Sequence, residues 1–142
     1  MHKTGYFTHP DCRRHDMGRG HPECPGRLDA IEDRMLASHL LDVVDRREAP
    51  LASPELFELA HDRMHVASIR GLAEEVTEEE NAGGDGLVFI DPDTAMNRHT
   101  WQAVLRASGA ALAATDAVIA GELENAFCAT RPPGHHACRS RA

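Results

Sequence analysis

The pattern of apolar and polar positions predicts helices that alternate with short apolar runs. The longest helical pattern covers residues 98–121, and its apolar side chains keep to one face. Shorter helical patterns cover residues 27–41 and the stretch from Val66 to Val76. A fourth helix is predicted to begin at Ser53, because a serine N-cap, a proline at the next position and then an acidic residue are typical of a helix start.

The apolar runs between these helices predict strands. They lie at residues 5–8, 43–44, 87–90 and 125–130; the third could also be a buried loop, and the fourth is predicted to be buried on both faces. Residues 9–26 hold too many prolines and glycines for a helix, and a loop of this length is typical of a functional segment. Strands that alternate with helices predict a single α/β domain over residues 1–142 with a mainly parallel sheet.

Composition and charge narrow the class of protein. Hydrophobic residues make up 42% of the chain, which is enough for a core. The formal net charge is −8 and the basic residues form no single stripe, so we expect no nucleic-acid partner. No apolar run is long enough to cross a membrane and no secretory signal precedes the first strand, so we expect a cytoplasmic protein without a membrane partner. The four cysteines form no C-x-x-C pair, and free thiols are expected.

Two adjacent histidines follow the last predicted strand. Two prolines stiffen the loop that carries His135 and His136, and Gly134 permits an unusual backbone angle. In a parallel sheet, functional groups gather beyond the carboxyl ends of the strands. Neighbouring imidazoles are rarely both protonated, so one can act as a base while the other donates a proton. From the pair alone, ordinary loop histidines remain the more frequent explanation.

Several segments resemble the histone deacetylase and acetylpolyamine amidohydrolase superfamily, and they occur in the same order. Residues 131–137 (RPPGHHA) resemble the active-site signature of that family, and residues 21–31 (HPECPGRLDAI) resemble its early His-Pro-Glu segment. The other similar segments are 59–66 (LAHDRMHV, with His65 where the family has a tyrosine), 91–94 (DPDT), Thr100-Trp101 and 107–110 (ASGA). The bacterial, class II-like branch is the most similar, and the resemblance covers almost the whole chain.

The resemblance implies a three-layer, arginase-like α/β fold with a small, mainly parallel sheet flanked by helices. It implies a zinc-dependent hydrolase that removes an acetyl or related acyl group from a lysine side chain or a polyamine. Carried over by position, His135 and His136 are the catalytic histidines. Asp91 or Asp93 stands where some relatives hold the substrate backbone, and an acidic turn next to a helix explains both aspartates equally well.

The resemblance does not reach the zinc ligands of the family. Those ligands, two aspartates and a histidine, follow the histidine pair, as does the oxyanion tyrosine, and the single tyrosine here is Tyr6. We therefore expect the N-terminal portion of a deacetylase domain, truncated before the zinc ligands and without zinc at the family site. Zinc lowers the pKa of water to about 7, a gain of roughly 10⁸–10⁹ in hydroxide, whereas two histidines contribute about 10²–10⁴. The chain alone is expected to be a very weak amidase.

Other metal sites are open alternatives. His61 and His65 are four residues apart and would share a helix face, although no third ligand is evident. The early loop contains an irregularly spaced group, for which shaping the active-site entrance is the simpler role; its members are His9, Cys12, His15 and His21.

The alternative function is a non-catalytic module that binds itself or a partner. A few strands of a larger sheet would leave an exposed edge and an apolar helix face, which another copy usually covers. We therefore expect a homo-oligomer, with an acyl-lysine or acylpolyamine as a further candidate ligand. Such an oligomer could also assemble a metal site from His135 and His136 of several copies.

Overall fold

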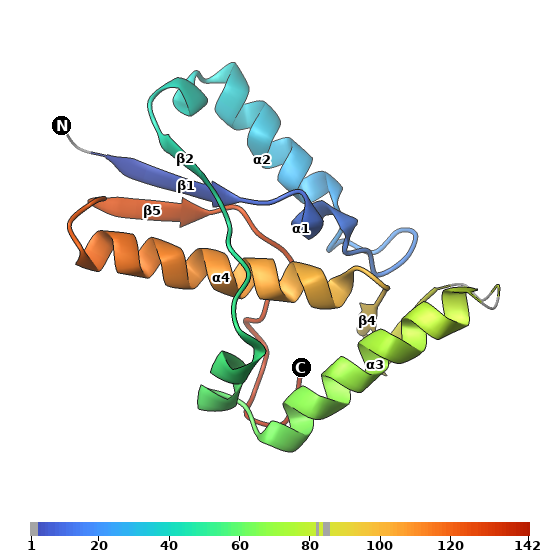
Figure 1. Ribbon diagram of the computed structural model, residues 1–142. Coiled ribbons are helices and arrows are strands. Elements are labelled where there is room, and N and C mark those ends of the chain that lie inside the picture. Colours follow the sequence, from blue (N-terminus) through green and yellow to red (C-terminus); the bar gives the residue numbers. More distant parts are fainter. Residues whose placement is uncertain (1–2, 82, 84–85) are drawn as a thin grey trace.

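The computed structural model describes residues 3–81, 83 and 86–142. Figure 1 shows its helices and strands in chain order. The strands are β1 (Thr4–Thr8), β2 (Asp45–Glu48), β3 (Val88–Asp91), β4 (Thr94–Met96) and β5 (Asn125–Cys128). The α-helices are α1 (Asp11–Arg14), α2 (Gly26–Ala37), α3 (Arg63–Asn81) and α4 (Thr100–Ile119), and two 3-10 helices span Leu40–Asp42 and Pro54–Leu59.

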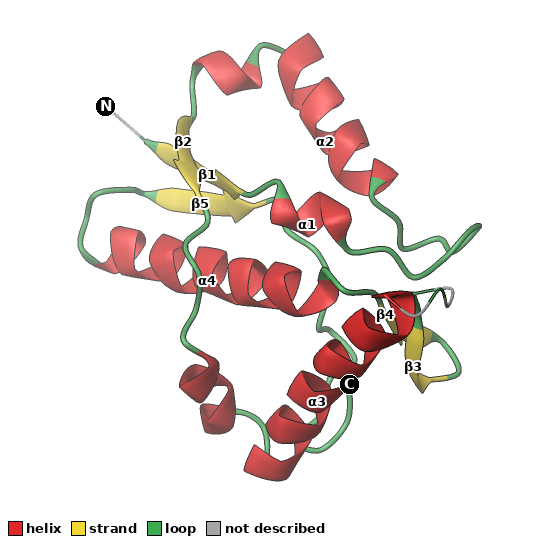
Figure 2. Ribbon diagram, turned by 45° about the vertical axis from the view of Figure 1, so that its right-hand side comes forward, coloured by secondary structure: helices red, strands yellow, loops and turns green. Residues whose placement is uncertain are grey.

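A small parallel sheet lies between helices and forms the middle of three layers (Figures 1 and 2). Its strand order is β2-β1-β5, so the first strand of the chain lies in the middle. Side chains of β1 alternate between the two faces of the sheet: Tyr6 packs in a cluster with Leu28 of α2, and Phe7 packs in a cluster with Ala110 and Ala114 of α4. The predicted fold class, a small parallel sheet flanked by helices, is confirmed.

Helix α4 approaches the chain after β2 very closely at Gly109. A Cβ atom at this position would lie 1.9 Å from the carbonyl oxygen of Pro50. The backbone amide of Ala52 donates a hydrogen bond to the carbonyl of Leu105 at 3.0 Å in the same contact. Because Gly109 has no side chain, α4 packs directly against the backbone of Pro50 and Ala52.

Replacing Gly109 with alanine is expected to lower the free energy of unfolding by about 1–3 kcal/mol, because the new methyl group must push the Pro50 backbone away. Urea denaturation followed by the fluorescence of Trp101 measures this change. The matched control is Gly71→Ala in α3, where a Cβ atom meets nothing within 4 Å. That control should gain about 0.5–1 kcal/mol from helix propensity, and equal stability of the two variants would contradict the packing argument.

Several sequence predictions are corrected by the structure. The early loop contains a short helix, α1, and β2 begins at Asp45 instead of Val43. Ser53 precedes a 3-10 helix and does not cap it, because its hydroxyl donates to the Glu55 carboxylate instead. Residues 88–96 form an antiparallel hairpin of β3 and β4, outside the main sheet.

The prediction that the last strand is buried on both faces is wrong. Strand β5 alternates between exposed and half-buried residues, and the Phe127 side chain is 48% exposed. Within the described part of the chain, β5 pairs with β1 alone, so its other side is an edge of the sheet. None of the helices among the described residues is long and apolar enough to span a membrane. All four cysteines have free thiols, as predicted.

Candidate functional site

The loops that follow the three parallel strands leave the sheet at the same end, where the carboxyl ends of the strands lie. The loop after β1 runs over residues 9–25, and the loop after β5 begins with Ala129 and leads to His135 and His136. The two imidazole rings lie 4.1 Å apart between centroids, and both side chains are exposed to solvent. The pair is therefore in mutual contact and accessible from outside, which proton transfer to a bound substrate requires.

A buried arginine holds the start of the histidine loop. Arg131 is 2% exposed and makes a two-pronged ion pair with Glu23 of the early loop. Its Nε donates to Oε1 of Glu23 at 2.6 Å and its Nη2 donates to Oε2 at 2.7 Å. Its Nη1 donates to two backbone carbonyls of the early loop, those of Cys12 at 2.9 Å and His15 at 2.8 Å. The guanidinium group thus joins the loop after β5 to the loop after β1.

The same network reaches the start of helix α4 through His15. Nδ1 of this buried histidine lies 2.8 Å from the hydroxyl of Thr100, the first residue of α4. The Thr100 hydroxyl also lies 3.0 Å from Oδ1 of Asn97, and the Asn97 side chain donates to the Arg14 carbonyl at 2.8 Å. Nε2 of His15 lies 3.4 Å from Oε2 of Glu23, so His15 links Glu23 to Thr100 at the start of α4.

Burial and charge set the protonation states of this network. Burial raises the pKa of the Glu23 carboxyl, but the hydrogen bonds and charge of Arg131 outweigh burial and hold that pKa below its usual value. Burial lowers the pKa of His15 from 6.5 to about 4, against the opposing charge of Glu23. At neutral pH the network therefore holds an ionised Glu23, a charged Arg131 and a neutral His15.

The segment after the histidine pair binds the start of helix α3. The carbonyl of Cys138 lies 2.8 Å from Nδ1 of His61. Asp62 accepts a hydrogen bond from Nε of Arg139 at 2.6 Å and a short one from the hydroxyl of Ser140. The histidine loop is thus attached at both ends, by a buried ion pair before it and by exposed contacts after it.

The idea that His61 and His65 share a helix face is wrong, because α3 begins at Arg63 and His61 precedes it. The two rings nevertheless lie 5.4 Å apart between centroids. The Cys138 carbonyl already lies within hydrogen-bond distance of Nδ1 of His61.

The two aspartates proposed to bind substrate lie in the turn of the β3–β4 hairpin. Oδ1 of Asp91 accepts a hydrogen bond from the backbone amide of Asp93 at 2.8 Å, and this bond is the main cause of the lowered pKa of Asp91. The side chain of Asp93 is 97% exposed, and its Oδ1 lies 3.5 Å from Nε2 of His21. Asp91 therefore shapes the turn, whereas the exposed Asp93 side chain lies beside His21 of the early loop.

The early loop uses its possible metal ligands for other contacts. Cys12 is fully buried in the core, and burial raises the pKa of its thiol, which disfavours the thiolate that a metal needs. Nδ1 of His9 accepts a hydrogen bond from the backbone amide of Asp11. Among the described residues, no three His, Cys, Asp or Glu side chains gather in a way that could hold a metal ion. The described side chains do not by themselves form the donor set that zinc requires.

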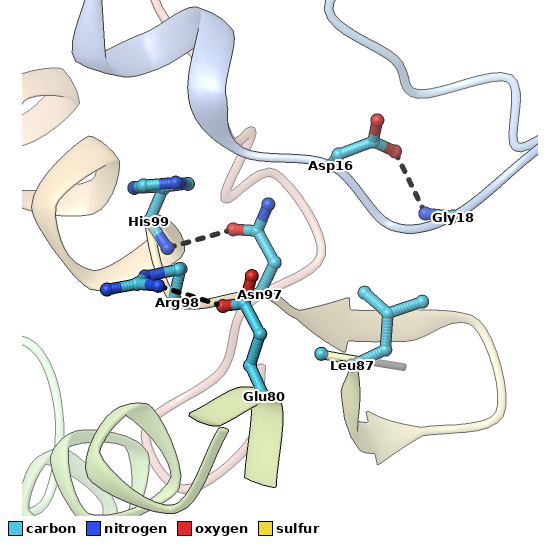
Figure 3. Close-up of a pocket in the computed structure, with 8 residues that line it drawn as sticks. Asp16, Gly18, Glu80, Leu87, Asn97, Arg98 and His99 are labelled. Carbon is cyan, nitrogen blue, oxygen red and sulfur yellow. Dashed lines mark hydrogen bonds and ion pairs between the residues drawn. The ribbon is translucent and has the colours of Figure 1, made fainter. Parts of the chain in front are cut away.

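A separate pocket of about 230 Å³ opens near the early loop (Figure 3). Asp16 and Gly18 line one side of it, and Asn97, Arg98 and the end of α3 line the other. Arg98 forms an ion pair with Glu80 at 3.4 Å, so these two charges neutralise each other in the wall. The pocket does not include His135 or His136 in its lining and is distinct from the histidine loop.

Comparison with known proteins identifies the family. A family model described as the histone deacetylase domain matches residues 21–142. The chain therefore belongs to the histone deacetylase family. The fold agrees: the HD domain of HDA15 superimposes with a TM-score of 0.81 at 21% identity, over 99% of this chain and 38% of that one.

Two relatives show how far the similarity extends. The histone deacetylase-like amidohydrolase of Pseudomonas aeruginosa is 31% identical over 123 residues, which are 87% of this chain and 30% of the relative. The polyamine deacetylase HDAC10 of Homo sapiens is 33% identical over an alignment of 145 positions, which covers 98% of this chain and 21% of the relative. The chain spans about a third or less of the length of these two relatives.

The sequence indicated the histidine pair but not the network beneath it. Glu23, Thr100 and Arg131 each belong to a segment that resembles the family, and the structure brings these three segments into contact. The available signal was that Glu23 and Arg131 are charged residues inside segments rich in glycine and proline. Such a charge is either exposed to solvent or paired with an opposite charge. The sequence alone does not say which partner it takes.

Proposed function

We propose that this chain supplies the proton-transfer part of a deacetylase site, with His135 and His136 as acid and base. The single observation that supports this is the contact of the two rings, 4.1 Å apart, on an exposed loop at the carboxyl edge of a parallel sheet. The proposed substrate is an acyl-lysine or an acylpolyamine, in keeping with relatives named histone deacetylase-like amidohydrolase and polyamine deacetylase. We place the reaction in the cytoplasm and regard residues 1–142 as the N-terminal part of a deacetylase domain.

The proposed mechanism assigns only proton movements to this chain. One imidazole accepts the proton of an attacking water, and the other, which enters the step in its protonated form, gives its proton to the departing amine nitrogen. Zinc, where a complete site binds it, supplies the polarised carbonyl and the acidified water. By themselves, the 142 residues are proposed to hydrolyse amides very weakly, because about 10²–10⁴ from acid–base catalysis does not replace the roughly 10⁸–10⁹ in hydroxide that zinc provides.

The test is zinc content together with hydrolysis of an acetyl-lysine peptide and of an acetylated polyamine, at high protein concentration with and without added zinc. Activity above buffer is expected to be low and to disappear in the double variant His135→Ala, His136→Ala. The control is His39→Asn, an exposed histidine with positive φ, for which asparagine is a tolerated replacement. Activity that the double variant keeps in full would contradict the proposal.

A second candidate function is a self-associating module without catalysis, and the open edge of β5 favours it. The strand carries no charged residue that would guard the edge, and Phe127 is 48% exposed beside its stacking partner Tyr6. Strand β2 at the opposite edge carries Arg46 and Arg47, so β5 is the side expected to pair with a second copy.

Light scattering coupled to size-exclusion chromatography is expected to show a dimer or larger species at micromolar concentration. Phe127→Lys should shift the population to the monomer, because a charge on the edge opposes pairing. Leu36→Lys serves as the control, since Leu36 is 63% exposed on α2 and away from the edge. A wild-type monomer at that concentration would rule out this second function, and no hydrolysis by any form would favour it over the first.

A further inference from the structure

We propose that Arg131 and Glu23 are positioning residues whose buried ion pair sets where the His135 and His136 rings stand. This inference rests on the proposed function of the histidine pair. It concerns residues that do not touch a substrate and act through the loop between them and the imidazoles.

The ion pair lies close to the two rings along the chain. Three residues, Pro132, Pro133 and Gly134, separate Arg131 from His135. The two prolines have a fixed φ and transmit the position of Arg131, while Gly134 accepts the hydrogen bond from the Ala137 amide at 3.0 Å that closes the turn. A displacement of Arg131 is therefore passed on to the rings over a short and stiff connection.

The histidine loop has two attachments, and they differ in burial. The contacts after the histidines are exposed: the side chains of Asp62 and Arg139 are 42% and 73% exposed. An exposed ion pair is screened by water and holds its partners weakly. The pair of Arg131 and Glu23 is buried, and removal of one partner leaves an uncompensated charge away from water. The buried attachment is therefore the one that fixes the loop.

The hydrogen bonds of Arg131 fix the orientation of its guanidinium group. The planar guanidinium group of Arg131 gives two parallel bonds to Glu23 and two more to the carbonyls of Cys12 and His15, so both its position and its rotation are determined. A lysine has the same charge but no rigid fork, and it cannot make these bonds in the same directions. Charge alone therefore does not replace Arg131.

The experiment compares wild-type protein with Arg131→Lys and with the control Arg106→Lys. Arg106 is partly buried and also joins two segments, donating to Asp11 at 3.1 Å and to the Ala49 carbonyl at 2.9 Å. The readouts are the NMR signals of the His135 and His136 rings, the contact between the two rings, and hydrogen exchange of the Ala137 amide. All three readouts are recorded under conditions in which urea denaturation shows that each variant is folded.

Arg131→Lys is expected to shift or double both ring signals, weaken the contact between the rings and speed exchange of the Ala137 amide by about tenfold or more. Arg106→Lys should leave these three readouts unchanged even where it lowers stability. Unchanged ring signals and exchange in folded Arg131→Lys would overturn the inference.

If Arg131→Lys does not fold, Glu23→Gln provides the same test, because it keeps the shape of the side chain and removes its charge. Folded Glu23→Gln with wild-type ring signals would equally overturn the inference. None of these readouts depends on hydrolysis. A chain that shows no deacetylase activity but whose ring signals respond to Arg131 would refute the proposed function and retain the positioning role.

Discussion

Replacing Glu23 with leucine is expected to lower the free energy of unfolding by about 3–5 kcal/mol, which is the usual cost of leaving a buried charge without its partner. Arg131 is 2% exposed, so bulk solvent does not reach it to replace the two carboxylate oxygens that it would lose. A domain of this size is stable by about 5–15 kcal/mol, so the variant should lie near the limit of folding. Urea denaturation at pH 7, followed by Trp101 fluorescence, measures the difference.

The double variant Glu23→Leu, Arg131→Met provides the control for this prediction. It removes both charges and is expected to be more stable than Glu23→Leu alone, because no buried charge remains. The recovery should be partial, since the carbonyls of Cys12 and His15 lose their donor. A double variant less stable than Glu23→Leu would show that the cost comes from packing and not from the unpaired charge.

Acidification from pH 6.5 to pH 4 is expected to remove up to about 3 kcal/mol of stability through His15 alone. The folded-state pKa of His15 is about 4, whereas the unfolded chain takes up a proton near pH 6.5. Between these values the unfolded state binds more protons, so stability is full above pH 6.5 and falls as the pH falls. The lowered pKa of Glu23 acts in the same direction but only below the usual range of a carboxyl, near and under pH 4.5.

Urea titrations at several pH values between 7 and 4.5 measure this effect. His15→Asn should be less stable at pH 7 and lose much less stability on acidification, because no proton is taken up at that position. His39→Asn, at an exposed position, should follow the wild-type pH dependence. A pH dependence in His15→Asn equal to that of the wild type would assign the effect to another group.

The parts of the fold that could be predicted from the sequence are those with a long local signal. Helix α4 repeats its apolar face over twenty residues, and its observed range of Thr100–Ile119 lies within the predicted 98–121. The apolar run at residues 87–90 indicated a possible strand where β3 lies, but β4 and the hairpin were not predicted, because β4 is only three residues long and the pairing is irregular between Phe89 and Asp91. An acidic turn beside a helix is the alternative to substrate binding for Asp91 and Asp93, and the structure places this turn between two strands instead.

The candidate site also contains one feature that local sequence predicts and one that it does not. His135 and His136 are neighbours in sequence, so their contact needed no knowledge of the fold. Arg131 and Glu23 are 108 residues apart, and no periodicity connects them. The propensities around Glu23 indicate only a loop, and tertiary contacts decide that its carboxylate is buried instead of solvated.

The central position of β1 has a consequence for how the protein is made. The hydroxyl of Thr8 donates to the carbonyl of Ala129, and the two residues are 121 positions apart in the sequence. Translation at about 5–20 residues per second leaves β1 without its β5 neighbour for roughly 6–24 s. During most of that interval β1 can pair with β2 but not with β5, and Phe7 lacks the α4 residues that cover it. The nascent chain therefore presents the strand that is most buried in the final fold to the ribosome surface and to chaperones before any part of the histidine loop exists.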